Sequence, residues 1–267
     1  MRFRLTIEYA GTRYSGWQIQ KNARTVQGEL QRAVATATGA RDFELYGSGR
    51  TDAGVHALAQ VAHLDLTTSM PPDTLMRRIN DELPADINIL EIQKVRHTFH
   101  ARHSARSRCY VYQVARRRMA FAKPFVWWVK DDLDLTRMRA VAQRLVGFHD
   151  FRSFSDDDPD HKSTTVSLTG LEIQEMGAIV LFRVEGSHFI WKMVRRLVGV
   201  IVEVGRGGLT ADEAVAMLST DSELPARLTA PASGLFLERV RYDGDPPGAD
   251  NPYGLLLAGG VIPLSRK

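Results

Sequence analysis

Alternation of apolar and polar residues predicts β-strands along much of the chain. Near the N-terminus Phe3, Leu5, Ile7 and Tyr9 are apolar, and the residues between them are polar. This period of two is typical of a strand with one buried face. Further strands are predicted at residues 43–48, 59–66, 87–95, 109–115, 167–176, 179–185 and 235–242. The strands at 167–176 and 179–185 are expected to form a hairpin that turns near Gly177.

Apolar residues that recur every three or four positions predict helices between these strands. The first helix is expected to begin near Thr25, to bury Leu30 with its neighbours on one face, and to end at Gly39. Asp73 is predicted to cap the second helix, which continues to about residue 83. Later helices are predicted at residues 135–146 and 191–204, followed by a short one opened by a capping box of Thr210 and Glu213.

The order of these elements predicts an α+β fold in which helices pack against mostly antiparallel sheets. Two such halves are expected to meet near residue 105, giving an N-terminal half at 1–105 and a C-terminal half at 106–243. Residues 244–267 begin with a stretch rich in Asp, Gly and Pro, which is typical of a linker and a loosely held tail. With 44% hydrophobic residues among 267, the chain can bury a sizeable core.

The composition bears on the cellular compartment. A single cysteine, Cys109, excludes an internal disulfide framework and fits a reducing compartment. The N-terminal residues alternate instead of forming a continuous apolar segment, and the longest apolar run, at about 197–202, is far shorter than a membrane span. We therefore expect a cytoplasmic protein that is not inserted in a membrane.

The net charge of +4 is mild, but the positive charge is concentrated in one segment. Residues 92–130, named here the basic block, contain ten lysines and arginines and no aspartate or glutamate. Aromatic residues interleave with these cations, namely Tyr110, Tyr112, Phe125, Trp127 and Trp128. Cations alternating with aromatic rings favour contact with nucleic acid. The alternative is a solvated charged face with buried aromatic residues.

A candidate site follows the second predicted strand, in the sequence GSGRTDAGVHA at residues 47–57. Its glycines allow sharp turns and the close approach of a ligand. Arg50 and Asp52 are two residues apart, so in an extended stretch they point to the same side. The loop fits neither the phosphate-loop spacing nor the dinucleotide-binding pattern. From composition alone, Asp52 could equally cap backbone N–H groups in a turn.

Residues 49–57, GRTDAGVHA, resemble the catalytic motif of the tRNA pseudouridine synthase A family. Six further stretches are similar to segments of that family and occur in the same order. These are residues 7–18, 25–30, 99–112, 147–154, 188–207 and 230–237. The resemblance thus covers almost the whole chain up to about Tyr242.

The resemblance implies a pseudouridine synthase fold, with two similar α+β halves around a basic cleft, in a homodimeric enzyme. The implied activity is an isomerase that converts uridine to pseudouridine at positions 38–40 of the tRNA anticodon stem-loop, without cofactor or metal. Asp52 matches the catalytic aspartate of the family. Whether this carboxylate attacks the sugar, adds to the base or abstracts a sugar proton is left open by the sequence, and each route needs it ionised.

Three more residues match positions of the family motifs. Arg195 matches the arginine that pairs with the catalytic aspartate, a counter-charge that a desolvated carboxylate needs. Arg50 resembles the arginine that replaces the extruded nucleotide in the base stack, and Tyr110 matches the residue that stacks on the target uracil. Arg196 stands where the family commonly has asparagine. It lies about 100° around the helix from Arg195, so we do not expect both side chains to approach the same carboxylate equally well.

The same residues allow three alternatives to a pseudouridine synthase. A non-catalytic RNA-binding protein would need the basic block but not Asp52, and an aspartate-dependent nucleoside hydrolase would admit water and release free uracil. His97, His100 and His103 recur at a spacing of three, which could form a metal-binding face on a helix. No acidic residue in that segment would complete or orient such a site.

Overall fold

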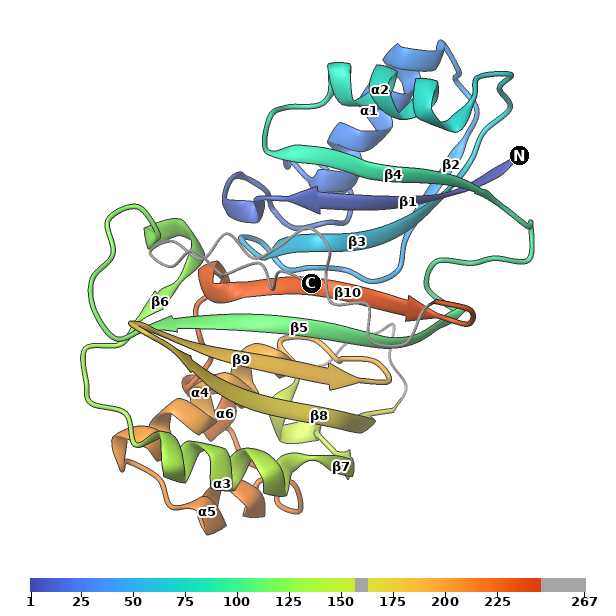
Figure 1. The fold of residues 1–267 in the computed structure, drawn as a ribbon. Helices are drawn as coiled ribbons and strands as arrows, with labels where there is room; N and C mark the ends of the chain where they lie inside the picture. Colours follow the sequence, from blue (N-terminus) through green and yellow to red (C-terminus); the bar gives the residue numbers. More distant parts are fainter. Residues whose placement is uncertain (157–162, 246–267) are drawn as a thin grey trace, which may run out of the picture. The chain divides into compact units, whose positions relative to one another are not determined.

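The computed structural model describes residues 1–156 and 163–245, which divide into two compact units. The first unit contains Met1–Ser107 and the described residues from Phe236 onward, and the second contains Arg108–Leu235. Each unit combines helices with a mostly antiparallel sheet (Figure 1). The predicted α+β class is therefore confirmed.

The sheet of the first unit has the strand order β4-β1-β3-β10, and β2 pairs with the final residues of β3. Its antiparallel pairs are β1 with β3, β1 with β4 and β2 with β3, whereas β10 runs parallel to the start of β3. Two helices, α1 and α2, pack against each other beside this sheet (Figure 1). The bounds are β1 Arg2–Tyr9, η1 Gly11–Arg13, α1 Val26–Thr38, β2 Glu44–Gly47, β3 His56–Asp65, α2 Pro72–Glu82, β4 Ile87–Val95 and β10 Leu235–Tyr242.

The ends of the first two helices show where local sequence rules hold and where they fail. Helix α1 begins after Thr25, whose side chain accepts a hydrogen bond from the Gly28 N–H, and ends at Gly39 with φ of 70°. Both predicted ends of this helix are confirmed. The predicted cap of α2 is wrong, because Pro71 is its N-cap and Asp73 lies in its first turn. Proline at the first helical position starts the helix two residues earlier than a cap at Asp73 would.

The sheet of the second unit has the order β5-β9-β8-β7, and the two-residue strand β6 runs parallel to the end of β5. The predicted hairpin is confirmed, with β8 and β9 joined at Gly177, which has φ of 59°. The bounds are β5 Ala105–Ala115, η2 Lys123–Phe125, β6 Trp127–Trp128, α3 Leu135–Leu145, β7 Gly147–Asp150, η3 Arg152–Phe154, β8 Thr165–Met176, β9 Ile179–Gly186, α4 Met193–Arg206, α5 Ala211–Ala216, α6 Leu224–Arg227 and η4 Ala232–Gly234.

Helix α4 is the most deeply buried helix of the second unit. Eleven of its fourteen residues are buried, and it packs against α3, which in turn packs on β8. The capping box predicted for Thr210 and Glu213 is present at the start of α5. Strand β10 pairs with β3 in the first unit, although the predicted division grouped it with C-terminal residues. The division into folding domains at residue 105 stays a prediction, and most of the predicted tail at 244–267 lies outside the described residues.

Candidate active site

The loop that carries Arg50 and Asp52 connects β2 to β3 and is pinned to β3 at its start. The Ser48 N–H donates to the Val61 carbonyl at 2.7 Å, and the Ser48 hydroxyl donates to Gln60 Oε1 at 2.6 Å. The Gln60 amide nitrogen then donates to the Gly49 carbonyl at 3.1 Å. Because Ser48 and Gln60 are buried, these bonds fix the loop to the sheet.

The segment after β1 braces the middle of the same loop. Thr51 is held twice, by a 2.8 Å hydrogen bond between its hydroxyl and that of Tyr9 and by the Trp17 N–H, which donates to its carbonyl at 3.0 Å. The Gly54 N–H donates to the Tyr14 carbonyl at 3.3 Å. Two motifs that are separate in the sequence, 7–18 and 49–57, therefore form one structure.

Two glycines allow this close packing. A Cβ atom on Gly16 would lie 2.6 Å from the Thr51 carbonyl oxygen, and Gly16 has φ of 94°, which side chains disfavour. A Cβ atom on Gly11 would lie 1.9 Å from the Val55 carbonyl oxygen. No other residue fits at either position without moving the loop.

Asp52 and Arg50 differ in burial. The Asp52 side chain is half-buried and the Arg50 side chain is exposed. The Val55 N–H donates to the Asp52 carbonyl at 3.1 Å, which closes a tight turn directly after the carboxylate-bearing residue. Asp52 thus sits at a fixed backbone position on a partly open loop, which is where a carboxylate could meet a substrate.

Tyr110 lies on β5 of the second unit, opposite Val184 of β9. Its ring is half-buried and meets the Phe189 ring edge-on, with centroids 5.1 Å apart and an interplanar angle of 85°. This packing gives the Tyr110 ring a fixed orientation.

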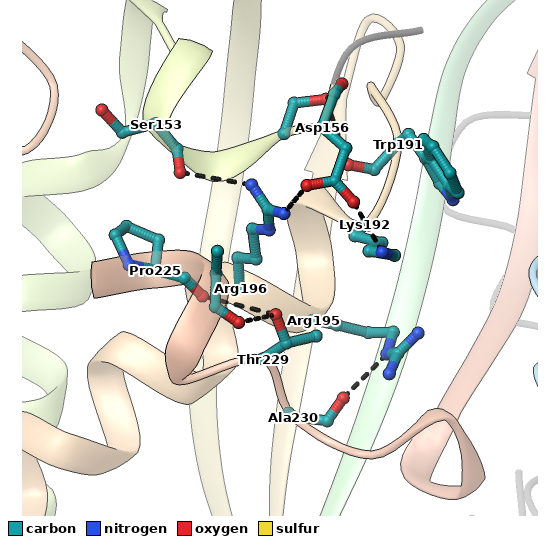
Figure 2. Close-up of polar contacts among 11 residues, drawn as sticks. Ser153, Asp156, Trp191, Lys192, Arg195, Arg196, Pro225, Thr229 and Ala230 are labelled. Atoms are coloured by element: carbon teal, nitrogen blue, oxygen red, sulfur yellow. Dashed lines mark hydrogen bonds and ion pairs between the residues drawn. The ribbon is translucent and has the colours of Figure 1, made fainter. Parts of the chain in front are cut away.

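Arg195 lies in the first turn of α4 and is attached to Ala230 at two points. Its Nε donates to the Ala230 carbonyl at 2.7 Å (Figure 2), and the Ala230 N–H donates to the Arg195 carbonyl at 3.1 Å. Close approach of α4 to this segment depends on Gly199, since a Cβ there would lie 1.8 Å from the Leu228 carbonyl oxygen.

Tyr112 links the segment after residue 230 to the strand that carries Tyr110. Its hydroxyl donates to the Pro231 carbonyl at 2.7 Å. Its ring packs against Gly234, where an added Cβ atom would lie 2.6 Å from the ring. Burial raises the pKa of the Tyr112 hydroxyl, and the positive charge of Arg195 opposes that shift. Three of the similar stretches, around Tyr110, Arg195 and Ala230, therefore pack together within the second unit.

Arg196 has a partner that sequence reasoning missed. Its guanidinium is 4% exposed and forms an ion pair with Asp156, and Lys192 forms a second ion pair with the same carboxylate at 2.5 Å (Figure 2). Forty residues separate Asp156 from Arg196, and no periodicity in the sequence connects them. As expected, Arg195 and Arg196 bind different groups.

The four predicted site residues thus fall into two pairs. Arg50 and Asp52 share one loop of the first unit, while Tyr110 and Arg195 belong to the second unit, where Tyr112 lies near both their elements. That the four side chains act on one substrate stays a prediction.

The basic block is partly neutralised by acids from distant parts of the sequence. Arg106 pairs with Asp243 at 2.6 Å, and Arg116 forms an ion pair with Glu175. Arg117 and Arg118 are exposed, and the Arg118 guanidinium carbon lies 5.3 Å from the centroid of the Trp128 ring. The charge available to an anionic ligand is therefore smaller than the sequence alone suggests.

The three spaced histidines serve a turn and not a helix face. His100 Nδ1 accepts hydrogen bonds from the backbone N–H groups of Arg102 and His103, at 3.2 and 3.3 Å. Within residues 1–156 and 163–245, no group of three or more His, Cys, Asp or Glu side chains is arranged to hold a metal ion. In the same ranges no helix is long and apolar enough to cross a membrane.

Comparison with known proteins adds a finding independent of this geometry. The sequence profile of a family described as tRNA pseudouridine synthase matches residues 5–104 and 141–243, which include Asp52 and Arg195. The tRNA pseudouridine synthase A of Nitrobacter winogradskyi is 42% identical over 249 residues, covering 92% of this chain and 97% of that protein. Those of a Bradyrhizobium species and an Exiguobacterium species are 41% and 36% identical, over 90% and 91% of this chain and 99% and 98% of their own lengths.

Proposed function

Because the chain belongs to the tRNA pseudouridine synthase family and is thus an isomerase, we propose that it converts uridine to pseudouridine at positions 38–40 of the anticodon stem-loop, with Asp52 as the essential catalytic residue. The observation that carries the assignment of Asp52 is the construction of its loop. Hydrogen bonds with Tyr9, Trp17 and Gln60 hold residues 49–51 before this carboxylate, and the bond from the Gly54 N–H to the Tyr14 carbonyl holds the chain after it.

The reaction is an isomerisation whose atoms balance within the nucleotide. The bond between N1 of uracil and C1′ of ribose breaks, a bond between C5 and C1′ forms, C5 loses its proton and N1 gains one. Such a reaction needs no oxidant and no external group. It does need an ionised carboxylate beside the sugar or the ring, and a site that retains the detached uracil.

Arg195, Tyr110 and Arg50 are assigned the other roles that the reaction needs. We assign Arg195 as the counter-charge of the catalytic carboxylate, since bonds to Ala230 hold both its backbone carbonyl and its guanidinium. The Tyr110 ring, fixed by Phe189, is assigned to stack on the target uracil. Exposed Arg50 is assigned to fill the space in the stack that the extruded nucleotide leaves, a step that costs a few kcal/mol of unstacking.

Analysis of the products of treated tRNA tests this function. Incubation of unmodified tRNA with the wild-type protein should yield pseudouridine, mapped to positions 38–40. An abasic site with free uracil would instead indicate a hydrolase, and unchanged tRNA that is nevertheless bound would indicate a binding protein. Pseudouridine at other positions would support the proposed synthase activity but refute the assignment to the anticodon stem-loop.

We also propose that the active form is a homodimer and that it acts in the cytoplasm. An L-shaped tRNA needs a wider binding surface than one chain of this size offers, and the buried, unbridged Cys109 suits a reducing compartment. Light scattering at micromolar concentration should give twice the chain mass. A monomer that still modifies tRNA would overturn the dimer.

A further inference from the structure

The charge of Arg196 lies inside the second unit and depends on Asp156. Nη2 of the guanidinium forms the ion pair with Asp156 Oδ1, and Nη1 lies 3.5 Å from the Ser153 carbonyl (Figure 2). In the part of the chain that the structure describes, the buried Nε of Arg196 has no hydrogen-bond partner. A cation this buried requires its carboxylate, because removal of one partner leaves the other charge uncompensated.

Lys192 forms an ion pair with the second carboxylate oxygen of Asp156. It is the N-cap of α4 and has φ of 62°, a backbone conformation that side-chain-bearing residues disfavour. Its Nζ lies 2.5 Å from Asp156 Oδ2 and 4.6 Å from the centroid of the Trp191 ring. The ion pair and the ring contact together hold Lys192 in this conformation.

Asp156 is well suited to remain charged between these two cations. Its partial burial would raise the pKa of the carboxyl, but hydrogen bonds from Lys192 and Arg196 outweigh that effect and lower the pKa. The carboxylate also lies at the N-terminal end of a fourteen-residue helix, where a negative charge is favourable.

Arg195 lies between this carboxylate and Ala230. The Arg196 N–H donates to the Lys192 carbonyl at 3.0 Å, so the two cations are joined by the first turn of the helix that contains Arg195. The Arg195 side chain extends away from Asp156, toward Ala230 (Figure 2). If the first turn loosened on the Asp156 side, the Arg195 guanidinium would lose its defined position.

We propose that Arg196, Lys192 and Asp156 form an ion-pair clamp that fixes the first turn of α4 and thereby positions Arg195 for the reaction. This inference rests on the proposed role of Arg195. Arg196 and Asp156 are positioning residues, since they act through Arg195 and not on the substrate.

Asp156→Asn tests the clamp with little change of shape. With saturating tRNA, its single-turnover rate should fall roughly tenfold while its tRNA dissociation constant stays unchanged. Asp156→Glu, which keeps the charge, should recover most of that rate. The matched control is Asp131→Asn, which removes an ion pair with Arg206, 2.8 Å, at the other end of α4 and should leave the rate unchanged.

Coupling to Arg195 separates positioning from general destabilisation. In an Arg195→Ala background, Asp156→Asn should cause no further loss of rate. Equal losses in both backgrounds, or a wild-type rate for Asp156→Asn, would overturn the proposal. Lys192→Gly removes one cation at a position whose backbone suits glycine, so it provides a second, readily folded variant with a smaller expected loss.

Hydrogen exchange makes the clamp testable without reference to catalysis. Backbone amides of residues 193–199 should exchange faster in Asp156→Asn than in wild type or in Asp131→Asn. Full activity of Arg195→Ala would refute the proposed role of Arg195, while this measurement would still report on the clamp. Unchanged exchange of these amides would refute the clamp itself.

Discussion

The Asp52 loop and the first turn of α4 carry the two residues most important to the proposed reaction, yet they are held by different forces. Neutral hydrogen bonds and close contacts at Gly11 and Gly16 fix the loop. Three charges meeting at Asp156 fix the helix turn. The loop should therefore be sensitive to added volume and indifferent to charge removal, whereas the helix turn should be sensitive to charge removal.

Gly16→Ala should give the largest effect on stability, because it adds volume where the loop is tightest. The new Cβ would meet the Thr51 carbonyl at 2.6 Å on a backbone with φ of 94°. We expect the free energy of unfolding to fall by about 2–4 kcal/mol, from overpacking plus the left-handed backbone. Urea denaturation measures this change.

Gly49→Ala is the control within the Asp52 loop itself, since a Cβ there would meet nothing within 4 Å. Its free energy of unfolding should stay within about 0.5 kcal/mol of wild type. Equal losses for the two variants would show that the contact with the Thr51 carbonyl is not the cause of the loss.

Acid pH should lower the stability of the first unit, because this unit contains the buried His63. Burial, with the nearby charges of Arg2 and His100, lowers the pKa of His63 to about 4, and Asp65 opposes this only weakly. Its Nδ1 accepts a hydrogen bond from the Ala101 N–H, as a neutral imidazole can. Between pH 6.5 and about 4, His63 is therefore protonated in the unfolded chain and neutral in the folded chain.

The stability due to neutral His63 is fully present above pH 6.5 and is lost as pH falls toward 4, amounting to about 2–3 kcal/mol. His63→Asn keeps an acceptor near the Nδ1 position and should remove this part of the pH dependence. Denaturation of both proteins from pH 4 to 7 measures the difference. If the free energy of unfolding changed with pH in the same way for both proteins, His63 would have the same pKa in the folded and unfolded chains.

The smallest expected effect is on the salt dependence of tRNA affinity. It concerns three arginines of the second unit that are exposed to solvent, unlike Arg196 of the clamp. Neutralising Arg116, Arg117 and Arg118 together should reduce the dependence of tRNA affinity on salt by about one to two phosphate contacts. Fewer than three are expected because Arg116 already pairs with Glu175. An unchanged salt slope would show that this cluster does not contact the RNA.

The contrast between the two regions also explains what could be predicted from the sequence. Residues 47–57 follow a strand and contain glycines, which have local signatures, so their place after a strand could be read directly. Their bracing by residues 9–17, across about forty residues, could not. The pairing of Arg196 with Asp156 could not, because an ion pair across forty residues leaves no periodic pattern. The same reason hid the acids that neutralise Arg106 and Arg116.

Single-turnover kinetics of Asp52→Asn, measured beside its tRNA affinity, test the central assignment most directly. The substitution keeps the size of the side chain and removes its negative charge. We predict a dissociation constant within about twofold of wild type and a rate of pseudouridine formation lowered at least about a thousandfold, because the carboxylate is the reagent and not a binding group. Appreciable turnover by Asp52→Asn would contradict the assignment.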